Sequence, residues 1–351
     1  MKKVFNHIFI DGLSGMASGL FATLIIGTII QQVGTLIGGT LGWYLVMFAK
    51  IASALTGAGI GVGVAAKFKS SVLVTVSAAT AGMIGAFSSK MLAGTVFTES
   101  GVVLSGPGEP LGAFIAALVA IEVGNLVSGK TKVDIIVTPC VSILSGAFVG
   151  IYLGPPISTF MSWLGSMINW GTEQEPFLMG IVVSVLMGIF LTLPISSAAI
   201  GIILNLSGLA AGAATVGCCC NMIGFAVASY KENGFGGLLA QGIGTSMIQM
   251  PNIVKKPIIW LPAIIASAIL GPISTVLCGM TNTASGSGMG TAGLVGQITT
   301  FQCMSQTKDP VVVMLLILIM HFLLPGIIAI GVSTFMRKNR WIKDGDMRLG
   351  V

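Results

Sequence analysis

Long stretches of this chain contain no charged residue, and they constrain its fold more than any other feature. The charge-free stretches are residues 12–49, 135–172, 176–230, 257–307 and 310–336. Each exceeds the roughly 20 apolar residues needed to cross a bilayer, and several could hold two crossings. Only 8% of the 351 residues are charged, and the mean hydropathy is +0.98. A soluble domain cannot cover its surface with so few charges, so an integral membrane protein is predicted.

The spanning elements are predicted to be helices. Lipid offers no hydrogen-bond partners, so only helices and closed barrels can cross it. Barrel strands alternate apolar and polar residues, whereas residues 311–319 (VVVMLLILI) and 181–193 (IVVSVLMGIFLTL) do not. The sequence therefore predicts an all-α membrane protein with about ten transmembrane helices. They are expected near residues 12–32, 34–50, 70–89, 110–129, 133–153, 176–194, 207–229, 236–252, 257–279 and 311–335.

The distribution of lysine and arginine predicts the orientation, because these residues are retained on the cytoplasmic side. With the N-terminus inside, all but three of the 17 basic residues are cytoplasmic, the exceptions being Lys90, Lys231 and Lys308. Both termini are therefore predicted to be cytoplasmic. The net charge of +6 then reflects topology, and neither it nor the basic tail indicates a nucleic-acid partner. The tail could contact anionic lipid headgroups.

Four apolar, glycine-rich segments lie between the predicted crossings. They are residues 55–66 (LTGAGIGVGVAA), 101–112 (GVVLSGPGEPLG), 195–205 (ISSAAIGIILN) and 281–293 (TNTASGSGMGTAG). Glycine and proline at membrane depth free backbone polar groups, which is tolerated only against protein or a polar cavity. Such re-entrant or broken segments form substrate sites in secondary transporters. The alternative is that they are small-residue packing surfaces or surface loops.

Few ionisable residues lie in these regions, where a charge is costly unless it lines water or a ligand site. Glu109, in Gly-Pro-Gly-Glu-Pro, is the first candidate for solute contact, because a carboxylate accepts hydrogen bonds from hydroxyl groups. Glu99 is either a second contact or a solvated residue at the outer mouth. Glu122 and His321 are candidates for proton or ion coupling. Alternatively, Glu122 pairs with Lys130 and His321 makes an ordinary helix contact.

Uncharged polar residues supply a second set of candidate solute contacts. Asn282, Ser285 and Ser287 share one glycine-rich segment, on the same predicted side of the membrane as Glu109. Asn205, in another such segment, is a further candidate. Amides elsewhere in the second half are expected to link helices by hydrogen bonds. They are Asn221, Gln241, Gln249, Asn252 and Gln297.

The residue inventory argues against catalysis within this chain. The six cysteines form no Cys-x-x-Cys pair, and the two histidines are not spaced to complete a metal site. No nucleophile, base and orienting group can be assembled, and there is no Walker A sequence. No metal and no cofactor are therefore expected. All three arginines lie in the tail, which favours a neutral, hydroxyl-rich solute over a multiply charged anion.

Several stretches resemble one known family. They are GPGEPLGAFIAALVAIEVGNLVSGKTKVDIIVTP (106–139), LTLPISSAAIGI (191–202), SGLAAGAATVGCCCNMIGFAV (207–227), GGLLAQGIGTSMIQMPNIVKKP (236–257) and GMGTAGLVGQ (288–297). Together they resemble the EIIC membrane component of the bacterial sugar phosphotransferase system, in the branch named after the perfringolysin O regulator (PfoR). The similarity covers nearly the whole chain.

The resemblance implies a ten-span fold of two five-helix halves with re-entrant segments, acting as a homodimer by alternating access in the bacterial cytoplasmic membrane. The chain then divides into a first half (1–153), an extracytoplasmic connection (154–175), a second half (176–336) and a basic cytoplasmic tail (337–351). Sugar EIIC proteins commonly bind substrate through a Glu-Pro motif, which Glu109-Pro110 matches. Glu175-Pro176 is a second match at the start of a span.

Transport of a small polar, sugar-like solute is therefore the expected function. Within a phosphotransferase system, a separate cytosolic EIIB-type subunit would have to carry the phosphorylated residue; another energy source is equally open. The first alternative is a membrane-embedded regulator or sensor without transport, acting through a cytosolic partner. An ion or solute channel is a further option, although no ring of acidic side chains is evident.

Overall fold

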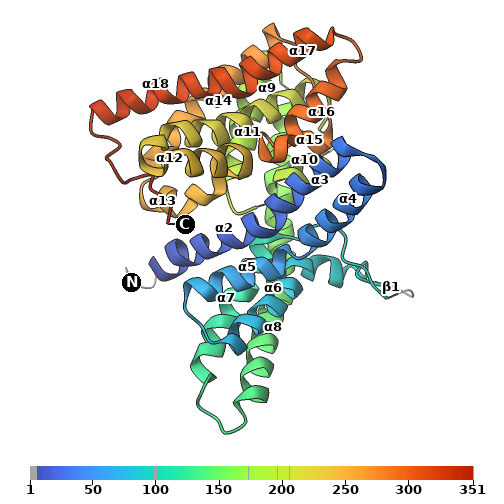
Figure 1. Ribbon diagram of the computed structural model, residues 1–351, viewed down its shortest axis with the longest axis vertical. Helices are drawn as coiled ribbons and strands as arrows, with labels where there is room; N and C mark the ends of the chain where they lie inside the picture. Colours follow the sequence, from blue (N-terminus) through green and yellow to red (C-terminus); the bar gives the residue numbers. More distant parts are fainter. Residues whose placement is uncertain (1–5, 99–100, 173, 196, 205, 351) are drawn as a thin grey trace. The chain divides into compact units, whose positions relative to one another are not determined.

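The described part of the chain is almost entirely helical. The computed structural model describes residues 6–98, 101–172, 174–195, 197–204 and 206–350. These residues divide into two units, the first within Met1–Met161 and the second Ser162–Gly350, and the division falls inside the predicted connection 154–175. The one strand pair that they contain joins β1 (Phe97–Thr98) to β2 (Gly101–Val102). The predicted all-α fold is confirmed (Figure 1).

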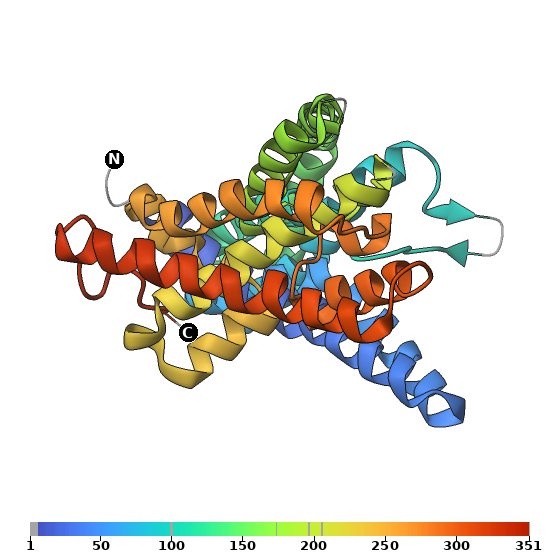
Figure 2. The ribbon, with the colours of Figure 1, turned by 90° about the horizontal axis from the view of Figure 1, so that it is seen from above.

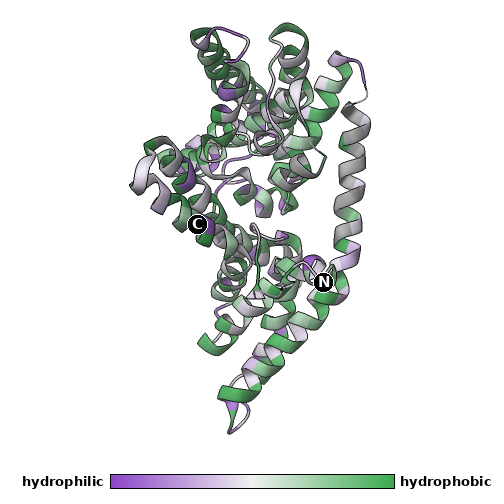
Figure 3. Ribbon diagram, turned by 90° about the vertical axis from the view of Figure 1, so that its right-hand side faces the viewer, coloured by the Kyte–Doolittle hydropathy of each residue, from purple (hydrophilic) through white to green (hydrophobic). Residues whose placement is uncertain are grey.

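Membrane-spanning candidates account for most of the helical residues. Within the described residues, seven helices are long and apolar enough to cross a bilayer: Ile10–Thr35, Val72–Leu92, Pro110–Val127, Asp134–Ile157, Gly208–Ala228, Pro257–Leu277 and Pro310–Lys338. A bent pair, Gly39–Ala54 with Thr56–Lys67, passes the same test with an angle of 55°. Green, hydrophobic residues dominate many of these helices in Figure 3. A multi-pass membrane protein is confirmed, whereas the count of ten is not.

The first unit is a helical bundle with a small hairpin between two of its helices. Its helices are α2 (Leu13–Leu20), α3 (Ile26–Ile37), α4 (Gly39–Ala54), α5 (Thr56–Lys67), α6 (Val72–Leu92), α7 (Pro110–Val127) and α8 (Asp134–Thr172), which continues past the unit's end, with π-helical turns at Asn6–Gly12 and Phe21–Ile25. The hairpin of β1 and β2 between α6 and α7 extends away from the helices of this unit (Figure 2).

Glycines let α5 pack closely against two neighbours. Gly57 and Gly61 face Gly82 and Ala78 of α6, whereas Gly59 and Gly63 face Gly19 and Gly15 of α2. At each of the four α5 positions an added Cβ would meet backbone atoms of the neighbouring helix. Each pair is spaced by four residues, as in the small-xxx-small motif of membrane helices. Residues 56–67 therefore form a packing helix, which follows Gly39–Ala54 at a bend of 55°.

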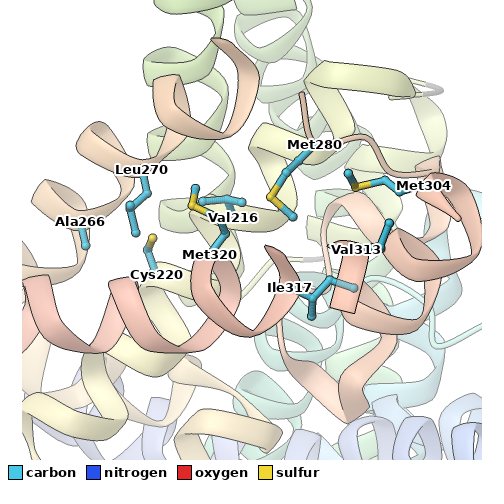
Figure 4. Packing of buried hydrophobic residues seen from close by; sticks show 9 residues of the cluster. All are labelled: Val216, Cys220, Ala266, Leu270, Met280, Met304, Val313, Ile317 and Met320. Carbon is cyan, nitrogen blue, oxygen red and sulfur yellow. The ribbon is translucent and has the colours of Figure 1, made fainter. Parts of the chain in front are cut away.

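The second unit surrounds a central helix. It contains α9 (Pro176–Thr192), α10 (Ser197–Ile203), α11 (Gly208–Ala228), α12 (Tyr230–Leu239), α13 (Met250–Lys255), α14 (Leu261–Pro272), α15 (Ala284–Ser287), α16 (Val295–Met304), α17 (Pro310–Ile317) and α18 (Leu324–Lys338). Helix α11 is buried along most of its length. Val216 and Cys220 of α11 pack with Leu270 of α14 and with Met320 in a hydrophobic cluster (Figure 4).

The predicted crossing at 236–252 is broken into short pieces. After α12, which contains Gly234 at φ +60°, come the π-helical turn η3 (Ala240–Gly244), the 3-10 turn η4 (Ser246–Gln249) and α13. Gln241 and Gln249 are fully buried here. These pieces do not form the continuous helix predicted from hydropathy, because glycines and Pro251 interrupt it.

The glycine-rich segments 195–205 and 281–293 contain the short helices α10 and α15, which pack together. The hydroxyl group of Ser197 on α10 donates to the carbonyl oxygen of Gly288, at 2.7 Å. Gly201 lies against Ser287, and the backbones of Gly208 and Asn282 form an isolated β-bridge. Neither segment is a long helix, so both retain the irregular backbone expected of a re-entrant or cavity-lining segment.

Candidate functional site

Two glycines and an extended residue place Glu109 at the start of α7. Gly106 and Gly108 have φ of +77° and +73°, which glycine adopts without strain. An added Cβ at Gly108 would meet Ala86 of α6, and the backbone N–H of Glu109 donates to the Ala86 carbonyl at 2.7 Å. Glu109 is the residue preceding Pro110, the first residue of the helix. The Gly-Pro-Gly-Glu-Pro sequence therefore ends one segment and starts a helix against α6.

The Glu109 carboxyl group has unused hydrogen-bonding capacity. Its Oε1 atom is buried and has no hydrogen-bond partner within the described structure. A buried oxygen without a partner costs free energy, on the order of 1–3 kcal/mol and more when charged. The α7 N-terminus, with its free N–H groups, favours negative charge at this position. An incoming hydroxyl group would supply the missing donor.

Lys90 connects α6 to the segment that precedes Glu109. Its Nζ donates to the Ser105 carbonyl oxygen at 2.7 Å and lies 5.6 Å from the centre of the Phe87 ring. This hydrogen bond holds Ser105 near the end of α6. Ser105 is four residues before Glu109 in the sequence. Lys90 is one of the three basic residues that break the predicted charge rule, and this contact gives it a local role.

Asn282, in the second unit, is fully engaged by the protein itself. Its Nδ2 donates to Thr215 Oγ1 at 2.8 Å and to the Gly296 carbonyl at 3.2 Å. Its Oδ1 accepts from the N–H of Thr283 at 2.7 Å, and the side chain is almost fully buried. Asn282 therefore joins the glycine-rich segment to α11 and α16.

The two serines of this segment differ in exposure. Ser287 is buried, and its hydroxyl donates to the Ala284 carbonyl at 2.9 Å. Ser285 is exposed, and its hydroxyl is 3.1 Å from that of Thr283, which is also exposed. Of the three residues predicted in this segment, only Ser285 presents an accessible polar group. Thr283 was not predicted, although it belongs to the same polar run.

His321 is buried beside Gln297 and Cys219. Its Nδ1 lies 3.2 Å from Gln297 Nε2, which also contacts Cys219 Sγ at 3.3 Å. Within the described structure, His321 Nε2 and Gln297 Oε1 have no partner. His321 thus contacts a residue of another helix, as the alternative prediction had it. Its role in proton or ion coupling stays a prediction.

Glu122 contacts His7 and not Lys130. Its Oε1 is 2.8 Å from His7 Nε2, and both side chains are nearly half exposed. The His7 ring stacks on Phe68 at 3.8 Å between centroids. The sequence spacing within α7 suggested Lys130, but the N-terminal segment is brought to the helix by the fold. The coupling role of Glu122 stays a prediction.

Glu99 and Asn205 lie outside the described residues.

Asn221 has a larger structural role than its sequence position suggested. Its Oδ1 accepts from Trp260 Nε1 at 2.8 Å and from Thr192 at 3.3 Å, and its Nδ2 donates to Ser267 Oγ at 3.3 Å. An asparagine within an apolar helix was the sequence feature that predicted a helix-linking role, and these contacts join α11 to neighbouring helices.

Among the described residues, no group of three or more His, Cys, Asp or Glu side chains is arranged to hold a metal ion. The six cysteines are free thiols, and Cys218–Cys220 are buried in α11. These three therefore pack as small apolar side chains.

The fold and site define a class: a multi-pass α-helical membrane protein whose irregular, glycine-rich segments carry polar groups. The model of the family "Phosphotransferase system, EIIC" matches residues 10–349. This chain belongs to that family, and the sequence resemblance is confirmed at this level. It is thus a membrane transporter component, of a kind that works with separate EIIB and EIIA components. A search of curated proteins found no match.

Proposed function

We propose that this chain is a permease for a small, hydroxyl-rich, sugar-like solute, and that Glu109 binds the solute. The observation that carries the proposal is the buried, unpartnered Oε1 of Glu109 at the start of α7. A solute hydroxyl would donate to this oxygen and replace the hydrogen bond that the protein does not supply. The exposed hydroxyl group of Ser285, in the second unit, is a separate candidate contact that is proposed independently of Glu109.

The wider proposal follows the family resemblance. Transport proceeds by alternating access in a homodimer of the PfoR branch, with both termini in the cytoplasm and a separate EIIB-type subunit as phosphoryl donor. Family membership supports the coupling to separate subunits. The charge distribution of the loops supports the orientation.

A thermal-shift screen tests the binding step. Purified protein in detergent is heated with sugars, polyols, nucleosides and small carboxylates, because a ligand that binds the native state raises its apparent stability. Saturable hits are then titrated by calorimetry. We expect a sugar or polyol hit. A clean negative across all classes, with folded protein, would argue against a solute carrier and favour the regulator.

Two glutamates in the same local sequence give a matched pair of variants. Glu109 and Glu175 each precede the proline that starts a helix, but Glu175 is exposed. Glu109→Gln should weaken binding of the hit by about ten- to a hundredfold, the worth of a hydrogen bond to a charged group. Glu175→Gln should leave it unchanged. Equal affinity in the two variants would remove Glu109 from the site.

A further inference from the structure

The C-terminal segment of the chain lies in a polar recess of the second unit. The segment is Asp344–Leu349, and the recess is formed by residues 229–256, the region of the broken crossing. Figure 1 shows the C-terminal end beside α12 and α13. Met347, the central residue of the segment, is fully buried although it is only four residues from the end of the chain.

Most contacts in the recess are made to the backbone of the segment. Five hydrogen bonds, of 2.8 or 2.9 Å, join side chains of the recess to three consecutive residues. The Met347 carbonyl accepts from Asn233 Nδ2 and Gln249 Nε2, the Arg348 carbonyl accepts from Asn252 Nδ2, the Met347 N–H donates to Glu232 Oε2, and the Leu349 N–H donates to Asn233 Oδ1. The segment itself turns over Asp344–Met347, with the Asp346 N–H donating to the Lys343 carbonyl oxygen. The side chains of the recess therefore bind the backbone of a turned peptide.

The recess is held in shape by hydrogen bonds among its own amides. Gln249 Nε2 donates to Gln241 Oε1 at 2.9 Å, Gln249 Oε1 accepts from Asn252 at 2.8 Å, and Gln241 also donates to Ser229. All of these side chains are buried. Their order before the peptide binds would reduce the entropy lost on binding.

Ion pairs add charge complementarity at both ends of the recess. Asp346 accepts from Lys256 at 2.5 Å, and Glu232 accepts from Arg337 at 2.7 Å. Glu232 bonds the backbone of Met347 as well, so this one carboxylate joins α18 to the segment. An acidic residue followed by an apolar one, Asp346-Met347, is thus the pattern that the recess fits.

We propose that residues 229–256 form a peptide-binding site whose occupant is the chain's own segment Asp344–Leu349, held there as a releasable latch. Among residues 344–349, Met347 is the one buried side chain, so release of the segment exposes a single apolar side chain and leaves the buried helices in place. When it leaves, buried amides of the recess lose partners, so the broken crossing must rearrange or admit water. The latch thereby couples the position of the tail to the conformation of residues 230–255.

Hydrogen–deuterium exchange of the intact chain provides the first test. The amide N–H groups of Met347 and Leu349 should exchange at least about tenfold more slowly than in an unstructured peptide, because both donate to buried side chains. Asn233→Ala should speed exchange at both positions. Asn339→Ala is the matched control, since the Asn339 side chain donates to the Phe335 carbonyl oxygen of its own helix end. Exchange at the unstructured rate in the wild-type chain would overturn the proposal.

A peptide supplied in trans tests the site directly. A chain ending at Lys343 is titrated with a synthetic peptide of residues 343–351 (KDGDMRLGV) and with the same peptide carrying Met347→Asp. We expect saturable binding of the first peptide, at least about tenfold weaker binding to the intact chain, whose site is occupied, and loss of binding with Met347→Asp. Equal binding to intact and shortened chains, or none to a folded shortened chain, would contradict the latch. If the shortened chain does not fold, the exchange experiment alone decides.

Discussion

Two glycine-rich segments with similar alternation have different structures. Residues 56–67 contain Gly57, Gly59, Gly61 and Gly63 and form a continuous helix, whereas residues 284–290 contain Gly286, Gly288 and Gly290 and stop after one turn. In the helix, apolar residues lie between the glycines, and the freed space is filled by neighbouring backbones. In the second segment, the Asn282 side chain bonds the backbone of Thr283 and Gly296. Flanking polar residues, and not glycine content, separate packing from a break.

The largest expected effect is on the packing helix. Gly61→Ala would place a Cβ against backbone atoms of Ala78, and neither helix can retreat without losing other contacts. We expect the free energy of unfolding to fall by about 3 kcal/mol, the upper end for overpacking. Thermal unfolding of both proteins in detergent measures this loss of stability, with aggregation detected by size-exclusion chromatography.

Gly331→Ala is the matched control for that substitution. Gly331 lies in α18, where an added Cβ meets nothing within 4 Å in the described structure. The variant should be unchanged or more stable by up to about 1 kcal/mol, because alanine favours helix. Equal losses of stability in the two variants would mean that Gly61 in α5 is no more closely packed than Gly331 in α18.

An intermediate effect is expected in the broken segment. Asn282→Ala removes the donor to Thr215 and Gly296 and the acceptor for Thr283, leaving buried groups unpaired. The expected loss of stability is about 2 kcal/mol. Ser285→Ala, at an exposed hydroxyl three residues away, should have no measurable effect on unfolding. A neutral Asn282→Ala would show that hydrogen bonds do not hold this segment.

A smaller effect separates the contribution of one partner. Thr215→Val keeps the shape of the side chain and removes the oxygen that accepts from Asn282, at an expected cost of about 1 kcal/mol. In the double variant with Asn282→Ala, the loss of stability should be smaller than the sum of the two single losses, by at least about 0.5 kcal/mol. Strict additivity in the double-mutant cycle would mean that Asn282 stabilises the protein through contacts other than the hydrogen bond to Thr215.

These contrasts also show what sequence reasoning could reach. The membrane class, the helical fold and most spans followed from charge-free length alone. For residues 55–66 the sequence left a re-entrant segment and a small-residue packing surface open, because the two faces Gly57/Gly61 and Gly59/Gly63 become visible only when α2 and α6 supply their partners. Hydropathy averages also concealed the interruptions in 236–252, where η3 and η4 replace a regular helix.

For the candidate site, the sequence indicated local backbone features but not the long-range partners of its polar side chains. The unusual position of Glu109 could be recognised locally from two prolines and two glycines. Asn282 was predicted as a solute contact because it shares a glycine-rich segment with Ser285 and Ser287 on the same predicted side of the membrane as Glu109. Its partner Thr215, 67 residues away in sequence, could not be predicted. Likewise, nothing near Glu122 in the sequence indicated His7, 115 residues away. Long-range pairing satisfies polar groups in ways that a single sequence does not display.

The smallest effect concerns charge, which distinguishes the tail from the segment around Asn282. Burial would raise the pKa of Asp346, but hydrogen bonds from Lys256 and from the Lys343 backbone lower it below its ordinary value. The contribution of the ion pair is fully present above the ordinary aspartate pKa of about 3.9 and is lost as the pH falls through the lower folded-state pKa.

Asp346→Asn should therefore lower stability by up to about 1 kcal/mol at pH 7, with the gap from wild type closing as the solution becomes more acidic than about pH 4. Unfolding temperatures across a pH series measure the gap. The gap between Asn282→Ala and wild type should not close in this way, because neither Asn282 nor its partners carry a charge. A pH-independent gap for Asp346→Asn would contradict the role of the ion pair.

Solute counterflow in proteoliposomes tests the central claim, that this chain is itself a permease. Vesicles containing wild-type protein are loaded with a solute identified by binding, and entry of the labelled solute is followed without any phosphoryl donor. We expect saturable counterflow that Glu109→Gln reduces about ten- to a hundredfold and Glu175→Gln leaves unchanged. If folded, reconstituted wild-type protein gave no counterflow above protein-free vesicles, the permease account would be contradicted.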